Sequence, residues 1–295
     1  MKNKIINDFN SNSINENYNK PQILLKLIIE NSISLQKGTV IFITQNGMEN
    51  SQRSPEFKDK NIYFGYKTKK SLINDIDFYL PENESLKNSL ESNNNFNSKS
   101  FDNEGKFFKI FYNEESKKFY IQDLGFGFGT FIRLTDEFIL KDNSLISIGD
   151  SYLVFSYSFP NENNSNNSSN NIFNNENSNN NNNILYLKPY SGSVKYQPVQ
   201  LSIDNNNNNN NNCFSVGRSE NCFCCLNDKM LSRVHCVIYF SKEKGWFIKD
   251  GNENGTPSTN GTWIYALEEM EIKDNMTFKA NSNLFSCHLG MWKNN

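Results

Sequence analysis

The chain has 295 residues and a mass of 34.1 kDa, enough for two ordinary domains. Hydrophobic residues make up 36% and aromatic residues 14%, so the chain holds enough apolar material for real cores and is not disordered throughout. The formal net charge of -2 and the pI of about 5.9 exclude the overall basic field that draws proteins to nucleic acids or anionic membranes.

The N-terminal segment, residues 1–20, is polar and rich in Asn, and we expect it to be disordered. It lacks the charged start and apolar run of a secretory signal. The apolar run from Ile23 to Ile29 is interrupted by Lys26 and is far too short to span a bilayer. We therefore expect an intracellular protein, in the nucleus or the cytoplasm, that does not bind a membrane.

Two polyasparagine tracts, Asn161–Asn183 and Asn205–Asn212, punctuate the rest of the chain. Such tracts cannot bury enough apolar surface to offset the entropy of ordering them, so they too are predicted to be disordered. The predicted organisation is a disordered segment, a domain, an Asn-rich linker and a second domain with a loop insert at 205–212. The boundaries are 1–20, 21–159, 160–183 and 184–295.

The second region contains short apolar segments rich in β-forming residues and separated by Gly, Asn and Ser turns. They lie at 184–189, 214–216, 235–240, 245–250, 262–265 and 284–287. No segment shows a sustained helical period. Short strands at roughly regular spacing predict an all-β sandwich.

The first region repeats this pattern. The matched pairs of segments are 119–123 with 246–250, 129–132 with 261–264, and 140–143 with 272–275. The interval from Thr130 to Asp142 equals that from Thr262 to Asp274. Equal spacing of matched segments is typical of a duplicated domain, so we expect two β-sandwiches in tandem.

Three motifs in the second region carry the functional signal: Val216-Gly217-Arg218, Leu231-Ser232-Arg233-Val234-His235 and Pro257-Ser258-Thr259-Asn260-Gly261-Thr262-Trp263. Each is weak alone, but in this order they resemble the forkhead-associated (FHA) domain. The resemblance implies two FHA-type sandwiches and a phosphothreonine peptide held by loops at one end of the second. It favours a binding module over an enzyme.

A phosphate ester carries about -1.5 to -2 charges and offers three acceptor oxygens, so its pocket needs cationic donors together with hydroxyl or amide donors. The resemblance implies that Arg218 and Ser232 hold the phosphate and that Arg233 adds a contact. It also implies that Thr259 and Asn260 contact the peptide.

The resemblance gives three further residues a supporting role. His235 is expected to brace the loop that bears the Ser rather than to contact the ligand. Gly217 and Gly261 are expected to permit tight backbone turns.

The first region lacks these features. Tyr66 stands at the position of Arg218, and a neutral phenol cannot form the cationic fork that grips phosphate oxygens. No His precedes His235, and residues 127–129 read Gly-Phe-Gly where residues 259–261 read Thr-Asn-Gly. We expect this domain to be a degenerate FHA copy that scaffolds its neighbour or binds an unphosphorylated partner.

Other chemistries find little support in the sequence. All six cysteines lie in the C-terminal third without paired C-x-x-C spacing, so plain packing or surface thiols are expected, with a metal or redox site as the alternative. The glycines within 124–129 alternate instead of following a nucleotide-binding spacing. Ser232 and His235 lack an orienting third group. We expect no catalytic residues, cofactor or metal.

The sequence thus predicts a signalling adaptor whose second domain binds a phosphothreonine-containing protein, a kinase substrate. The alternative is a structural tandem with contacts that do not depend on phosphate. Nucleic acid, a membrane and a small-molecule substrate are not expected as partners.

Overall fold

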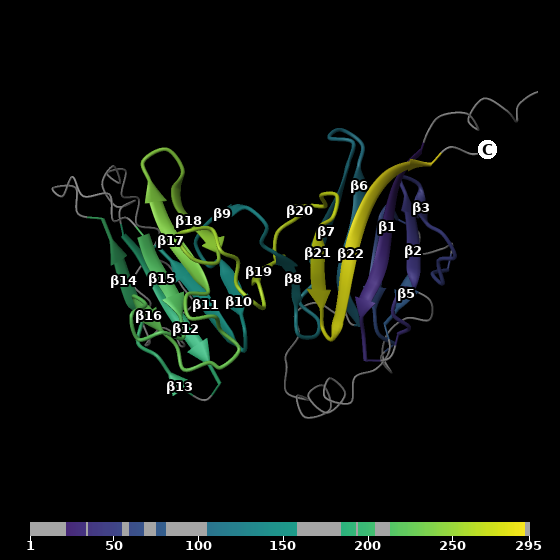
Figure 1. Ribbon diagram of the computed structural model, residues 1–295. Coiled ribbons are helices and arrows are strands. Elements are labelled where there is room, and N and C mark those ends of the chain that lie inside the picture. The colour runs from purple at the N-terminus through teal and green to yellow at the C-terminus, as the bar shows by residue number, and fades with distance from the viewer. Residues whose placement is uncertain are drawn as a thin grey trace, which may run out of the picture.

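The computed structural model (Figure 1) describes residues 22–33, 35–54, 59–67, 75–80, 105–157, 184–192, 194–203 and 213–292. The predicted disorder of residues 1–20, 160–183 and 205–212 lies outside these ranges. Every regular element within them is a β-strand, which confirms the all-β prediction. In the same ranges, no helix has the length and apolar character needed to cross a bilayer.

The strands form two lobes (Figure 1). Lobe 1 consists of β1 (Gln22–Asn31), β2 (Val40–Thr44), β3 (Gly47–Met48), β4 (Asn61–Gly65), β5 (Phe78–Tyr79), β6 (Lys106–Asn113), β7 (Lys118–Asp123), β8 (Thr130–Arg133), β20 (Met270–Glu271), β21 (Thr277–Ala280) and β22 (Asn283–Trp292). Lobe 2 consists of β9 (Glu137–Ile139), β10 (Leu145–Ile148), β11 (Ser151–Ser156), β12 (Ile184–Ser191), β13 (Val194–Lys195), β14 (Val199–Ser202), β15 (Cys213–Gly217), β16 (Cys224–Cys225), β17 (Cys236–Ser241), β18 (Gly245–Asp250) and β19 (Thr262–Tyr265).

One 12-stranded sheet runs through both lobes, in the order β13-β12-β11-β10-β19-β8-β21-β22-β1-β2-β3, with β14 paired to β12. A five-stranded sheet completes each sandwich: β5-β4-β6-β7-β20 in lobe 1 and β16-β15-β17-β18-β9 in lobe 2. The lobes meet where β8 pairs antiparallel with β19, with Ile132 opposite Ile264 and Arg133 opposite Trp263. Strand β8 therefore covers the sheet edge of lobe 2, and β19 covers the sheet edge of lobe 1. Each edge would be exposed if its lobe stood alone.

The two halves of the sequence exchange their last three strands. Strands β9 to β11 come from the first half but complete lobe 2, and β20 to β22 come from the second half but complete lobe 1. Lobe 2 is consequently one continuous stretch, residues 134–265, inserted into lobe 1. The strands do not group by the predicted domains 21–159 and 184–295, because each of those segments contributes to both lobes.

The exchanged segments make equivalent contacts in the two lobes. The backbone N–H of Leu140 donates to the carbonyl of Trp246 in lobe 2 (2.9 Å), and that of Ile272 donates to the carbonyl of Phe119 in lobe 1 (2.8 Å). Both side chains are almost fully buried. The local apolar pattern is similar in both segments, so this pattern by itself does not show which lobe each segment completes.

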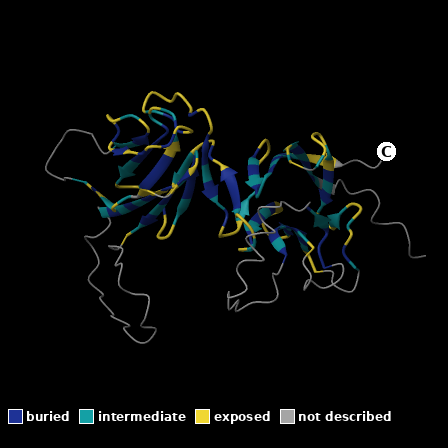
Figure 2. Ribbon diagram, turned by 90° about the horizontal axis from the view of Figure 1, so that it is seen from below, coloured by how far each residue is buried: buried dark blue, intermediate teal, exposed yellow. Residues whose placement is uncertain are grey.

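Each core therefore mixes residues from both halves of the chain. Figure 2 shows the buried interiors of the strands in dark blue. In lobe 1, Phe64 and Phe108 stack at 4.6 Å between ring centroids, and Phe108 meets Phe278 edge-on at 5.4 Å. In lobe 2, the fully buried Trp246 belongs to the same cluster as Phe155 from the first half. Large aromatic side chains bury much apolar area and stabilise both lobes.

Candidate functional site

The predicted site residues lie in three loops of lobe 2. Arg218 follows β15, Ser232 and Arg233 lie between β16 and β17, and Thr259 and Asn260 lie between β18 and β19. Two backbone groups join the loops: Arg218 N–H donates to the carbonyl of Ser232 (3.1 Å), and Thr259 N–H donates to Ser232 Oγ (3.0 Å). The Ser232 hydroxyl also lies 3.4 Å from Thr259 Oγ1. The structure thus brings these loops together.

The cationic side chains of these loops have no carboxylate partners. Arg218, Lys229 and Arg233 are exposed, and none of them forms an ion pair within the described part of the chain. The carboxylate of Asp228 in the same loop is buried and occupied by protein donors. The loops thus present three exposed cations without ion-pair partners, although the exposed carboxylates of Glu220 and Glu253 belong to the same loops.

Asn260 joins the third loop to the second. Its Nδ2 donates to the carbonyl of Met230 (2.7 Å), and its own carbonyl accepts from Trp263 Nε1 (2.9 Å). The side chain is exposed, and its oxygen has no hydrogen-bond partner among the described residues. That oxygen can accept a bond from a ligand N–H without disturbing the contact that holds the side chain in place.

His235 is fully buried and both of its ring nitrogens are bonded to protein. Nδ1 accepts from the N–H of Ser232 (3.2 Å), so the proton resides on Nε2, which donates to the carbonyl of Gly261 (3.0 Å). Burial lowers the pKa of His235, which keeps the ring neutral and this tautomer in place. The ring thus connects the Ser232 loop to the Asn-Gly turn and does not face a ligand.

The two predicted glycines serve different purposes. At Gly261, φ is +76°, a left-handed conformation that favours glycine, as the sequence predicted for a tight turn. Gly217 lies at the end of a strand without a positive φ, and a Cβ there would stand 2.3 Å from the carbonyl oxygen of Arg233. Its role is to let the Ser232 loop approach the strand closely, so the expected tight turn at Gly217 is corrected.

Sequence reasoning missed Asp250, which organises the third loop. Its carboxylate accepts from the N–H of Ser258 (3.0 Å), from Ser258 Oγ (2.6 Å) and from Thr262 Oγ1 (2.7 Å). A lone Asp at a strand end carries no motif. Its match with Asp123 in the first half was nevertheless a signal that the position holds a turn.

Sequence reasoning also missed Asp228, which supports the Ser232 loop from beneath. Its Oδ2 accepts from Ser151 Oγ (2.7 Å) and from the N–H of Asp150 (2.9 Å), and its Oδ1 accepts from the N–H of Met230 (2.8 Å). Ser151 and Asp150 belong to the hairpin that the first half of the chain contributes. No local pattern could have revealed this contact, because its partners are about 77 positions apart in sequence.

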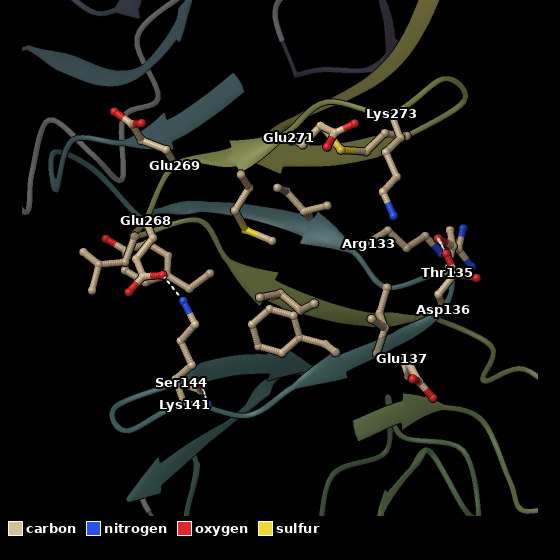
Figure 3. A pocket seen from close by; sticks show the side chains of 18 of the residues that line it. Arg133, Thr135, Asp136, Glu137, Lys141, Ser144, Glu268, Glu269, Glu271 and Lys273 are labelled. Carbon is tan, nitrogen blue, oxygen red and sulfur yellow. Dashed lines mark hydrogen bonds and ion pairs between the residues drawn. The ribbon is translucent and has the colours of Figure 1, made fainter. Parts of the chain in front are cut away.

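A separate pocket of about 530 Å³ lies between the lobes, where the chain crosses from one to the other (Figure 3). None of the predicted site residues lines it. Its carboxylates are largely paired: Glu268 with Lys141, and Glu271 with Lys118 at 2.9 Å. Asp142 and Asp274 accept backbone N–H bonds instead, from Tyr157 and Leu289 respectively.

All six cysteines are free thiols. Burial raises the pKa of Cys224 to about 11, so this thiol stays protonated near neutral pH. Within the described ranges, no group of three or more His, Cys, Asp or Glu side chains is arranged to hold a metal ion.

Residues 214–279 match the family model of the FHA domain. This match begins in lobe 2 and ends within β21 of lobe 1, so it includes β20 and most of β21 but neither β22 nor β9 to β11. A search of the curated proteins found no significant match. Among solved structures, the Slr1951 protein from Synechocystis sp. matches at 19% identity and a TM-score of 0.19, covering 31% of this chain and 87% of that chain. This partial likeness carries no inference about function.

Proposed function

We propose that this FHA domain protein is an adaptor whose lobe 2 binds phosphothreonine-containing proteins through Arg218, Ser232, Arg233, Thr259 and Asn260. FHA domains are interaction modules for such proteins and are not catalytic, which gives the class of partner. In this assignment, Arg218 and Ser232 grip the phosphate, and Arg233 adds a second cation. Thr259 and Asn260 contact the peptide beside the phosphothreonine.

The observation that carries the proposal is the set of exposed cations without partners beside a hydroxyl that is already oriented. Thr259 N–H fixes Ser232 Oγ at 3.0 Å, and the neutral His235 holds the backbone of the same loop. A phosphate placed between Arg218 and Ser232 would receive charge-assisted hydrogen bonds from groups that need little reorganisation. Two or three such bonds, at about 1.5 to 3 kcal/mol each, would make binding strongly dependent on phosphorylation.

We further propose that the first half supplies a degenerate FHA copy. Gly65 corresponds to Gly217: a Cβ at Gly65 would stand 2.2 Å from the carbonyl oxygen of Gly105. The N–H of the next residue, Tyr66, donates to that same carbonyl (2.7 Å), as Arg218 N–H donates to the carbonyl of Ser232. A neutral phenol thus occupies the place of the arginine, which supports a structural role for this copy.

The experiment is a titration of the full chain with phosphothreonine, phosphoserine and unphosphorylated peptides selected from an oriented library. We expect Arg218→Ala to weaken phosphothreonine binding by more than about tenfold, the loss of one charge-assisted bond, with an unchanged unfolding temperature. Lys242→Gln, which removes an exposed cation on the β17–β18 turn, serves as the matched control. Binding that Arg218→Ala and phosphatase treatment leave intact would instead favour the structural tandem.

A further inference from the structure

A second group of cations lies where the two lobes join. We call it the junction cluster: Phe131 and Arg133 on β8, Trp263 on β19 and Lys279 on β21. Arg133 is the cross-strand neighbour of Trp263, and Phe131 is that of Lys279. Since β8 and β21 belong to lobe 1 and β19 to lobe 2, the cluster exists only because the sheet is continuous.

The cluster holds two positive charges, and the carboxylate of Asp150 acts electrostatically on Lys279 without forming an ion pair with it. Lys279 Nζ lies 5.2 Å from the ring centroid of Phe131 and 5.0 Å from that of Trp263, and it donates to Ser147 Oγ (3.1 Å). The guanidinium carbon of Arg133 lies 5.9 Å from the Trp263 ring. In the described part of the chain, neither cation forms an ion pair. Burial lowers the pKa of Lys279 to about 8, and the charge of Asp150 opposes this shift only in part.

The junction cluster adjoins the loops of the proposed phosphothreonine site. A Cβ added to Gly261 would stand 2.8 Å from Arg133 Nε, so the arginine packs directly on the Asn260-Gly261 turn. Trp263 Nε1 donates to the carbonyl of Asn260 (2.9 Å). Arg133 is exposed, and Figure 3 shows its side chain at the rim of the pocket between the lobes rather than at its centre. A peptide held at Asn260 has only to continue along this turn to reach Arg133.

We propose that the junction cluster is an accessory anion site, which binds an acidic group in the same peptide whose phosphothreonine lobe 2 holds. This inference rests on the proposed function. The acidic group is a carboxylate of Asp or Glu, or a second phosphate, because both present several acceptor oxygens to a guanidinium. Arg133 provides the exposed contact, and Lys279, held between two aromatic rings, adds positive charge behind it.

The same face of the sheet continues with Tyr152 and Tyr190, which are 40% and 45% exposed. Aromatic rings beside cations also hold single-stranded nucleic acid. A nucleic-acid groove needs a run of cations along the backbone, whereas this cluster has two. Their contact with the Asn260-Gly261 turn favours a peptide.

The test compares full-length protein and variants on one phosphothreonine peptide with Ala, Glu or phosphoserine scanned through the flanking positions. We expect wild type to prefer an acidic residue at one or two positions by about fivefold at low salt, the size of an exposed ion pair. We expect Arg133→Gln and Lys279→Met each to lower the ratio of the affinity for the acidic peptide to that for the Ala-flanked peptide towards one. The affinity for the Ala-flanked peptide itself does not change. Lys242→Gln keeps the full preference. Comparing Glu with phosphoserine at the same position identifies which anion is preferred.

The outcomes separate this inference from the function on which it rests. If Arg218→Ala retains phosphothreonine binding, the proposed function fails and the accessory site fails with it. If phosphothreonine binding depends on Arg218 but no acidic preference exists, or the preference survives in Arg133→Gln and Lys279→Met, only the accessory site is overturned. Binding of a labelled single-stranded oligonucleotide that requires Arg133 would overturn it in favour of nucleic acid.

Discussion

The exchange of strands predicts which fragment of this protein folds alone. A fragment of residues 134–265 contains all strands of lobe 2, whereas a fragment of residues 184–295, cut at the boundary suggested by the sequence, lacks β9, β10 and β11. We expect the first fragment to fold and to bind phosphothreonine peptides. We expect the second to be unfolded, although it contains every predicted phosphopeptide residue.

The magnitude follows from the core of lobe 2. The shorter fragment loses six buried side chains: Leu134, Leu140, Ile146, Ile148, Leu153 and Phe155. At about 1.5 to 3 kcal/mol for each large apolar side chain, the loss is about 9 to 18 kcal/mol. A typical domain is stable by only about 5 to 15 kcal/mol. The hydrogen bonds that β10 makes with β19, and β11 with β12, are lost as well.

The assay is thermal unfolding followed by near-ultraviolet circular dichroism, together with amide chemical-shift dispersion for each fragment. A cooperative transition and dispersed spectra are expected for 134–265 only. Adding a fragment of residues 134–157 to 184–295 should restore structure, because it supplies the missing strands. Cooperative unfolding of 184–295 by itself, at a temperature close to that of the full chain, would refute the arrangement of strands described here.

Two further predictions concern the loops of lobe 2. The pKa of His235 is lowered by burial below the value of about 6.5 that it has in an unfolded chain, so the unfolded state takes up the proton first and stability falls as the pH drops from 6.5 towards 5. Denaturant midpoints measured over this range should fall in wild type and in His288→Gln but much less in His235→Gln; equal slopes in all three would contradict the assignment. Gly217→Ala places a Cβ 2.3 Å from the carbonyl oxygen of Arg233 and should lower the free energy of unfolding by about 1 to 3 kcal/mol. Gly290→Ala, whose Cβ meets nothing within 4 Å, should change it by less than about 0.5 kcal/mol, and similar losses in both variants would show that the close approach at Gly217 is not the cause.

Much of the local structure could be predicted from the sequence. The strands at Gly245–Asp250 and Thr262–Tyr265 have the predicted bounds, since alternating apolar residues and flanking turns define them locally. The two- and three-residue strands β9, β16 and β20 escaped prediction, because so few residues display no period. Motifs located the three loops, but the support that Asp228 gives the Ser232 loop and the packing of Arg133 against Gly261 had no motif because the partners are distant in sequence.

The sequence by itself determined the β-sandwich class, the repeated pattern and the loops that carry Arg218, Ser232 and Asn260. Only the tertiary structure decided which strands complete which lobe. The two repeats share local features that do not distinguish the lobes: Asn143 and Asn275, for example, adopt the same left-handed turn, with φ of 63° and 61°. The choice between them depends on pairing across the whole chain, above all on β8 with β19, and that pairing brings Arg133 against the Asn260-Gly261 turn.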